Sequence, residues 1–233
     1  MTEQIMKKLK ELGEPDRAAH SQKYFRTGPG EYGEGDRFLG IRVPLVRKEV
    51  RKNRTLPLES AAELLQSRWH EARLFAVLVL VEKFKRGSEK EREQIFKLYL
   101  DSTSTINNWD LVDCSAPHIV GQWLLTGDRS LLRELALSQS IWERRISIIA
   151  TMRFIDHDQF DDTLKIADML LQDSEDLIHK AVGWMLREVG KRDRKTEEDF
   201  LRPRYKNMPR TMLRYAIEKF EPELRKQYLK GLV

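Results

Sequence analysis

The stretch "NNWDLVDCS", residues 107–115, places an indole and a carboxylate four residues apart, at Trp109 and Asp113. In a helix, side chains at this spacing lie on the same face, one above the other. The pair could be ordinary packing, one half of a structural ion pair, or a site for a positively charged substrate. Trp109 and Asp113 are therefore the first candidates for chemistry in this chain.

A structural ion pair is the interpretation that the residues alone favour for Asp113. A helix through this stretch would bury the apolar stripe of Val112, Ala116, Ile119 and Trp123. Trp109 and Asp113 would lie on its flank, where a carboxylate is only partly solvated. Arg145 falls within the apolar stripe of its own predicted helix, and a buried arginine needs an anion. A pair between Asp113 and Arg145 is thus favoured over a catalytic aspartate.

A second unusual aromatic residue is Trp184, in a helix predicted over 176–191. At about 100° per residue, the core stripe of this helix consists of Ile178, Val182, Met185 and Val189. Trp184 lies on the far side with three cations, Lys180, Arg187 and Lys191. Burial against a neighbouring repeat is the favoured explanation. The alternative is an aromatic surface in a basic groove, suited to a sugar or base beside phosphates.

Other motifs carry less weight. "GPGEYG", residues 28–33, matches G-x-G-x-x-G by letters, but a dinucleotide site needs a preceding strand and a helix that opens on the last glycine. Here a helix end precedes the motif and more loop follows it, which predicts a connector between N-terminal helices. Cys114 and His118 could form a thiol–imidazole pair, but no third member or oxyanion donor accompanies them. The histidines lack ligand spacing, so we expect no metal site.

Helical periodicity extends over almost the whole chain, which predicts an all-α fold. Breakers near residues 13–15, 57, 87–88, 127–128 and 209 divide the chain into segments of helix length. Arg73, Asp113, Arg145 and Lys180 follow one another at intervals of 40, 32 and 35 residues, in similar helical contexts. Such spacing is typical of HEAT-like helical hairpins, which stack into a solenoid with a concave groove. A compact helical bundle is the competing fold.

Composition describes a folded, charged protein of 233 residues, 40% hydrophobic and 34% charged. A single cysteine and the absence of a signal-peptide core or a long apolar run predict a cytoplasmic location. The net charge is +5, and residues 180–233 hold 15 basic against 8 acidic residues, a net +7, which leaves −2 for the first 179. This basic C-terminal part suggests a polyanionic partner such as nucleic acid, although it could simply aid solubility.

Five segments together resemble the AlkD-type DNA alkylation repair glycosylases, a family built from HEAT-like repeats. They are "YFRTGPGEYGEGDRFLGIRVPLVRKEV", "WHEARLFAVLVL", "NNWDLVDCSAPHIVGQWL", "IWERRISI" and "IHKAVGWMLREVGK", in that order. The family's active-site pattern is a Trp, an Asp four residues later, an Arg in the "IW..R" helix and a Trp in "GW.LRE". It falls on Trp109, Asp113, Arg145 and Trp184, with no departure at any of the four.

The resemblance implies a single HEAT-like domain over residues 1–233, with a concave basic groove. It also implies a monofunctional enzyme that excises cationic N3-methyladenine and N7-methylguanine from duplex DNA without cofactor or metal, as a monomer. Asp113 would stabilise an oxocarbenium-like sugar and position water, the two indoles would favour the cationic sugar, and Arg145 would hold a phosphate.

Further phosphate contacts are expected from six cations: Arg42, Arg47, Arg187, Lys191, Arg210 and Arg214. Arg210 and Arg214 lie near the start of a helix predicted to begin at Pro209, where free backbone N–H groups would also suit a phosphate. The rival hypothesis is a HEAT-like scaffold that binds DNA structures or a protein and performs no chemistry.

Overall fold

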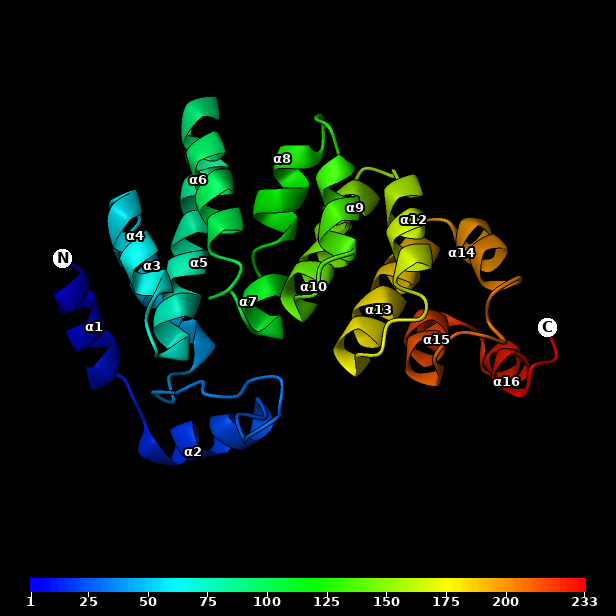
Figure 1. Ribbon diagram of the computed structural model, residues 1–233, viewed down its shortest axis with the longest axis horizontal. Helices are drawn as coiled ribbons and strands as arrows, with labels where there is room; N and C mark the ends of the chain where they lie inside the picture. Colours follow the sequence, from blue (N-terminus) through cyan, green and yellow to red (C-terminus); the bar gives the residue numbers. More distant parts are fainter. The chain divides into compact units, whose positions relative to one another are not determined.

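The computed structural model describes residues 1–233, and all its regular elements are helices (Figure 1). The only β interaction is an isolated bridge between Arg37 and Trp69. No helix is both long enough and apolar enough to cross a membrane. The all-α prediction is therefore confirmed. The chain forms two compact units, Met1–Ile119 and Val120–Val233.

Unit 1 is built around one central helix. Its helices are α1 (Thr2–Glu11), α2 (Pro15–Tyr24), α3 (Val43–Lys52), α4 (Leu58–Leu65), α5 (His70–Arg86), α6 (Glu89–Asp101) and α7 (Trp109–Asp113). The central helix α5 packs against α3, α4, α6 and α7. Most of its side chains are buried on every face, as expected of a helix surrounded by others.

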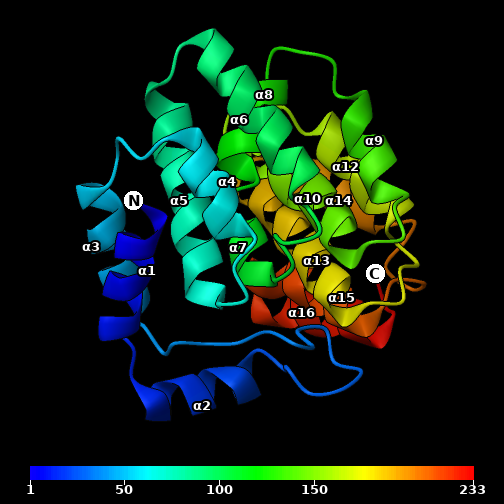
Figure 2. The ribbon, with the colours of Figure 1, turned by 60° about the vertical axis from the view of Figure 1, so that its left-hand side comes forward.

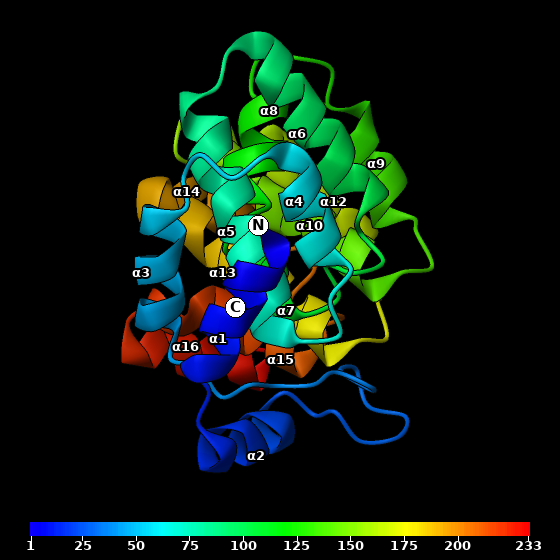
Figure 3. The ribbon, with the colours of Figure 1, turned by 90° about the vertical axis from the view of Figure 1, so that its left-hand side faces the viewer.

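The glycine-rich stretch forms a long connector between α2 and α3, as the sequence predicts. Figures 1 and 3 show α2 and this connector at one side of unit 1, away from α3 and α4. Gly40 has a φ of +81°, and a Cβ there would lie 2.2 Å from the Glu14 carbonyl oxygen. Only glycine allows this backbone approach, which holds the end of the connector against the start of α2.

Unit 2 consists of helices packed in succession along the chain. They are α8 (Gln122–Leu124), α9 (Ser130–Ala136), α10 (Ile141–Ala150), α11 (Met152–Ile155), α12 (Asp161–Met169), α13 (Asp176–Arg192), α14 (Arg194–Leu201), α15 (Arg210–Ala216) and α16 (Pro222–Lys230), with a 3₁₀ turn at Ile217–Lys219. The helix α10 packs against α9 and α13, and α13 packs against α12, α14 and α15. The pair α9 and α10 and the pair α12 and α13 are visible in Figures 1 and 2.

The predicted breakers all separate helices, because α2, α4, α6, α9 and α15 begin within three residues of them. Local chemistry explains these starts. Pro15 opens α2, where its missing N–H costs nothing, and Ser88 with Glu91 forms a capping box at α6.

One prediction is wrong: the stretch from Trp109 to Leu124 is not one helix. The α-helix ends at Asp113, and a π-helical turn at Pro117–Gly121 precedes α8. Pro117 has no N–H to donate, so the α-helical ladder cannot continue through it. The hydroxyl of Ser115 also donates to the Leu111 carbonyl at 2.5 Å. Val112, Ala116 and Ile119 are fully buried as expected, whereas Trp123 is only half-buried.

Candidate functional site

The position of Trp109 is fixed first by its own helix start. Asn108, which is completely buried, is the N-cap of α7, and its side-chain oxygen accepts a hydrogen bond from the Trp109 N–H at 2.8 Å. Its side-chain amide donates to Asp36 Oδ2 at 3.4 Å. Asp36 lies in the glycine-rich connector, so this contact joins the connector to the first residue of α7.

A buried ionic network extends this connection to the central helix α5. Asp36 accepts from Arg73 and, at 2.9 Å, from Nδ1 of His70. The other ring nitrogen of His70, Nε2, lies 2.8 Å from Oδ2 of Asp110 in α7. The side chain of His70 is 2% exposed and that of Asp36 is 3% exposed. The network therefore ties α7 to both the connector and α5.

The charges in this network stabilise one another. Burial alone would lower the pKa of His70, but Asp110 and Asp36 outweigh it and raise that pKa to about 9. Burial likewise opposes ionisation of Asp36, but His70 and Arg73 hold its pKa below the usual value. At neutral pH the imidazole is protonated, and two cations balance two carboxylates in the network.

A carboxylate next in sequence to His70 fixes the connector from a second side. Glu71 accepts hydrogen bonds from three successive backbone N–H groups, those of Leu39, Gly40 and Ile41, at 2.8, 2.7 and 3.1 Å. Glu71 is 3% exposed, so a substitution would leave these amides unpaired in a dry environment.

The indole of Trp109 also belongs to an aromatic stack. Its ring lies 5.2 Å from Phe25 at an interplanar angle of 20°, Phe25 stacks on Phe38, and Phe38 stacks on His70. Tyr24 meets the indole edge-on at 6.1 Å. The stack covers one face of Trp109 and holds the plane of the ring, while the residue as a whole remains partly exposed.

Asp113 lies one helical turn after Trp109, at the last residue of α7, and is half-buried. The neighbouring Cys114 does not have the properties of a nucleophile. Burial raises the pKa of its thiol to about 12, and Asp110 and Asp113 add to the effect. His118 is exposed, in the π-helical turn.

In unit 2, Arg145 is 5% exposed within α10, as its place in an apolar stripe predicts. Its Nη1 donates to the Leu177 carbonyl in the first turn of α13. This contact lies beside a second one, because Arg144 donates to Asp173 at 2.7 Å just before α13 begins. Two consecutive arginines of α10 thus fix the start of the helix that carries Trp184.

Trp184 is half-buried on α13, opposite the core stripe that the sequence predicts; Ile178, Val182, Met185 and Val189 are completely buried. Its Nε1 donates to Glu188 at 3.1 Å, and Lys191 donates to the same carboxylate at 2.7 and 2.8 Å. Arg187 pairs with Glu218 and lies 3.6 Å from Glu188. The indole and two of the predicted DNA-binding cations therefore gather around one carboxylate.

The remaining predicted DNA-binding cations differ in what engages them. Arg42 is exposed and lies 4.0 Å from Glu14, and Arg47 is exposed on α3. Arg210, the first residue of α15, donates to the Leu229 carbonyl at 2.7 Å, whereas Arg214 is exposed and has no ion pair. The site residues thus lie in two groups: Trp109 and Asp113 in unit 1 with Arg42 and Arg47, and Arg145 and Trp184 in unit 2 with the other four.

Sequence reasoning missed the buried network of Asp36, His70, Arg73 and Asp110 and the neighbouring contacts of Glu71. The signal for it was present in "WHEAR", where a histidine and a glutamate open a helix that is otherwise apolar. Polar residues at such a position need buried partners. The partners of His70, however, lie 34 and 40 residues away, and no local pattern links either of them to His70.

A solved structure and a family model both match this chain. A solved structure described as a predicted DNA alkylation repair enzyme from Enterococcus faecalis matches with a TM-score of 0.71 and 19% identity, over 91% of this chain and 98% of its own. At this identity the likeness shows the fold alone. A search of curated proteins finds no match. The model of the family described as DNA alkylation repair enzyme matches residues 5–220, so the chain belongs to the DNA alkylation repair enzyme family.

Proposed function

We propose that this chain is a monofunctional DNA glycosylase that excises cationic alkylated purines, N3-methyladenine and N7-methylguanine, from duplex DNA. Membership of the family supports a role in DNA repair and a DNA substrate. The observation that carries the finer proposal is the placement of Trp109 and Asp113. They occupy the two ends of α7, a short helix whose start is held by Asn108, by the ionic network and by the aromatic stack.

This arrangement suits bond cleavage at a sugar that becomes positively charged. A cationic purine is already a good leaving group, so the enzyme need not supply a strong acid. It must stabilise the oxocarbenium-like sugar as the bond lengthens, and a fixed carboxylate does so without reorganisation. Asp113 supplies that charge and positions water. The indoles of Trp109 and Trp184 offer ring faces to the cation, and Arg145 holds a backbone phosphate.

The proposal takes residues 1–233 as one functional domain. The family match runs from residue 5 to residue 220 and so includes most of both compact units. The proposed roles are likewise distributed over both units. Trp109 and Asp113 lie in unit 1, and Arg145 and Trp184 lie in unit 2. Substitutions of these residues in either unit are therefore expected to reduce activity.

The test is release of N7-methylguanine from methylated duplex DNA under single-turnover conditions, without added metal. Replacing Asp113→Asn should reduce release about 100-fold or more, because the loss of one preorganised electrostatic contact commonly costs that much. Binding of the DNA should be unchanged. The matched control is Asp101→Asn, which removes an exposed carboxylate at the end of α6 and should leave release unchanged.

Release at the spontaneous rate by the wild-type protein would contradict the enzymatic proposal. If such a protein still bound DNA, the non-catalytic scaffold would become the better explanation. Equal release by wild type and Asp113→Asn would leave the family assignment intact but would remove Asp113 from the mechanism.

A further inference from the structure

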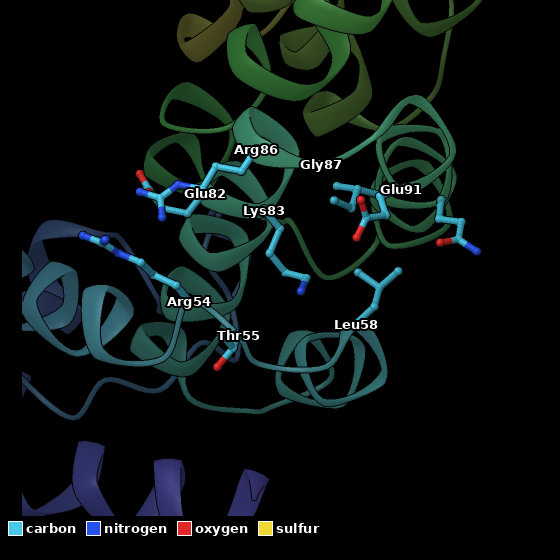
Figure 4. A pocket seen from close by; sticks show the side chains of 10 residues that line it. Arg54, Thr55, Leu58, Glu82, Lys83, Arg86, Gly87 and Glu91 are labelled. Atoms are coloured by element: carbon cyan, nitrogen blue, oxygen red, sulfur yellow. The ribbon is translucent and has the colours of Figure 1, made fainter.

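A pocket of about 450 Å³ lies in unit 1, and none of the proposed site residues lines it (Figure 4). The α3–α4 loop, the end of α5 and the first turns of α6 form its walls. Three cations line it, Arg54, Lys83 and Arg86, together with the carboxylates of Glu82 and Glu91. Its volume lies within the range of roughly 300–1,000 Å³ that is typical of small-molecule sites.

Lys83 is the central charge of this pocket. It comes from the last turn of α5, and Figure 4 shows its side chain extending into the space between Thr55 and Leu58. The side chain is half-buried, yet its ammonium group has no hydrogen bond and no ion pair. A partly desolvated ammonium group without a fixed anion favours an anionic ligand.

The carboxylates that line the pocket are already engaged. Glu91 accepts from the N–H and the hydroxyl of Ser88, at 2.7 and 2.8 Å, in the capping box of α6. Glu82 lies 3.4 Å from Arg86 and 3.9 Å from Lys85. Lys83 interacts electrostatically with Glu91 but forms no ion pair with it. Three cations against two carboxylates leave the pocket with a positive excess.

Backbone groups around the pocket favour an anion as well. The first turn of α4 starts after Pro57 and has no side-chain cap, so its N–H groups are open beside Leu58. The carboxyl end of α5 carries a partial negative charge that would repel an anion. Arg92 reduces this charge, because it donates to the carbonyls of Phe84 and Lys85, at 3.0 and 3.4 Å.

Apolar atoms form the rest of the surface. Ile95 is buried at 1% exposure and Leu58 is half-buried, and both line the pocket. A ligand that fits would carry its negative charge at Lys83 and place an apolar or aromatic group against Leu58 and Ile95. Figure 4 shows that Arg54, by contrast, extends away from Lys83.

We propose that this pocket binds a small ligand that carries one phosphate group and one flat or apolar group, of about the size of a mononucleotide. Lys83 contacts the phosphate directly, and Leu58 with Ile95 holds the other group. The site is separate from the proposed glycosylase chemistry and does not depend on it.

The test is a titration of the full-length protein with adenosine 5′-monophosphate, followed by backbone amide NMR and calorimetry. We expect saturable binding with shifts at Thr55, Lys83 and Gly87. Replacing Lys83→Met, which retains the apolar stem, should weaken this binding about tenfold or more, because one charge-assisted contact is lost. Adenosine and inorganic phosphate, tested separately, should each bind more weakly than the nucleotide.

The matched control is Lys97→Met, since Lys97 lies on α6 with Glu93 at 2.6 Å and does not line the pocket. It should bind the nucleotide like wild type. No saturable shifts at millimolar nucleotide would overturn the proposal, as would equal affinity of Lys83→Met in a variant whose melting temperature is unchanged. If undamaged duplex DNA loses affinity in Lys83→Met while the nucleotide does not bind, the pocket is a DNA contact and the proposal is wrong.

Discussion

His70 is the residue whose chemistry is most altered by the fold. Two carboxylates contact its ring nitrogens, and Arg73 is the other cation in the same network. Phe38 stacks on the ring and excludes water from it. Because the fold raises the pKa of His70 to about 9, the protonated imidazole acts as a permanent cation at neutral pH. His70 therefore acts as the cationic member of a buried ion pair, and its charge does not change near neutral pH.

The raised pKa predicts a loss of stability at alkaline pH. A group whose pKa is higher in the folded state stabilises fully below its unfolded pKa, about 6.5, and this stabilisation disappears as pH rises through 9. Between pH 7 and 8.5 the contribution of His70 to the free energy of unfolding should fall by about 2 kcal/mol. Denaturation by urea at the two pH values measures it. His70→Gln should lack this part of the fall, and His20→Gln, at an exposed histidine of α2, should retain it.

Glu197 also lowers the free energy of unfolding as the pH rises. The contribution of His70 is therefore the difference between the fall in wild type and the fall in His70→Gln. Burial raises the pKa of this carboxyl to about 8, with Glu198 adding to the effect and Arg194 opposing it. An identical fall in wild type and His70→Gln would contradict the argument. If His70→Gln does not fold, ¹⁵N NMR of the wild-type imidazole decides the question, because the ring should stay protonated up to pH 8.

At the scale of elements, the sequence predicts helices well where periodicity and breakers agree. The helix predicted over 176–191 is α13, Asp176–Arg192, with the expected core stripe. The helix after Trp109 is harder to predict. Its apolar spacing continues across Pro117, but the α-helical backbone does not. Periodicity reports which residues are buried, and it remains informative even where a helix is interrupted.

Some features of the candidate site can be predicted from the sequence, and others cannot. The burial of Arg145 and the position of Trp184 opposite the core stripe follow from the pattern on their own helices and could be predicted. Burial of Trp184, the favoured explanation, is only partial, because the residue is half-buried. The support of Trp109 by Asp36, His70 and Phe25 could not. Those contacts join residues that are distant in sequence, and their geometry depends on how the connector folds rather than on any local periodicity.

Close packing of α13 against α15 gives a prediction about the element that carries Trp184. A Cβ at Gly183 would lie 2.4 Å from the Met212 carbonyl oxygen and 2.6 Å from Cβ of Tyr215. Gly183→Ala should therefore force the two helices apart and destabilise the protein by about 2 kcal/mol, despite the better helix propensity of alanine. Urea denaturation measures the change.

Gly127→Ala is the control, because a Cβ there would meet only the Trp123 carbonyl oxygen at an ordinary 3.8 Å. It should change the free energy of unfolding by much less. A stable Gly183→Ala variant would show that α15 can move away without loss, and α13 would then be held mainly by α10.

For the whole molecule, the uneven charge is the property most relevant to a DNA substrate. The chain carries a net +5, yet the last 54 residues alone carry +7, and the preceding 179 carry −2. Many of these C-terminal cations are already paired: Arg187 with Glu218, Lys191 with Glu188, and Arg204 with Asp168. Net charge therefore overstates the number of cations that are available to phosphates without an exchange of partners.

Salt dependence of DNA binding measures how many cations make that exchange. If all six candidates contact phosphates, a plot of log K against log salt should have a slope of about −5, since each contact contributes about −0.9. Arg214→Met should reduce the steepness by about 1, because this exposed arginine has no competing carboxylate. Lys90→Met, at an exposed position on α6, should leave the slope unchanged. A slope of about −3.6 would mean that Arg187 and Lys191 stay with their carboxylates. Binding insensitive to salt would favour a protein partner over DNA.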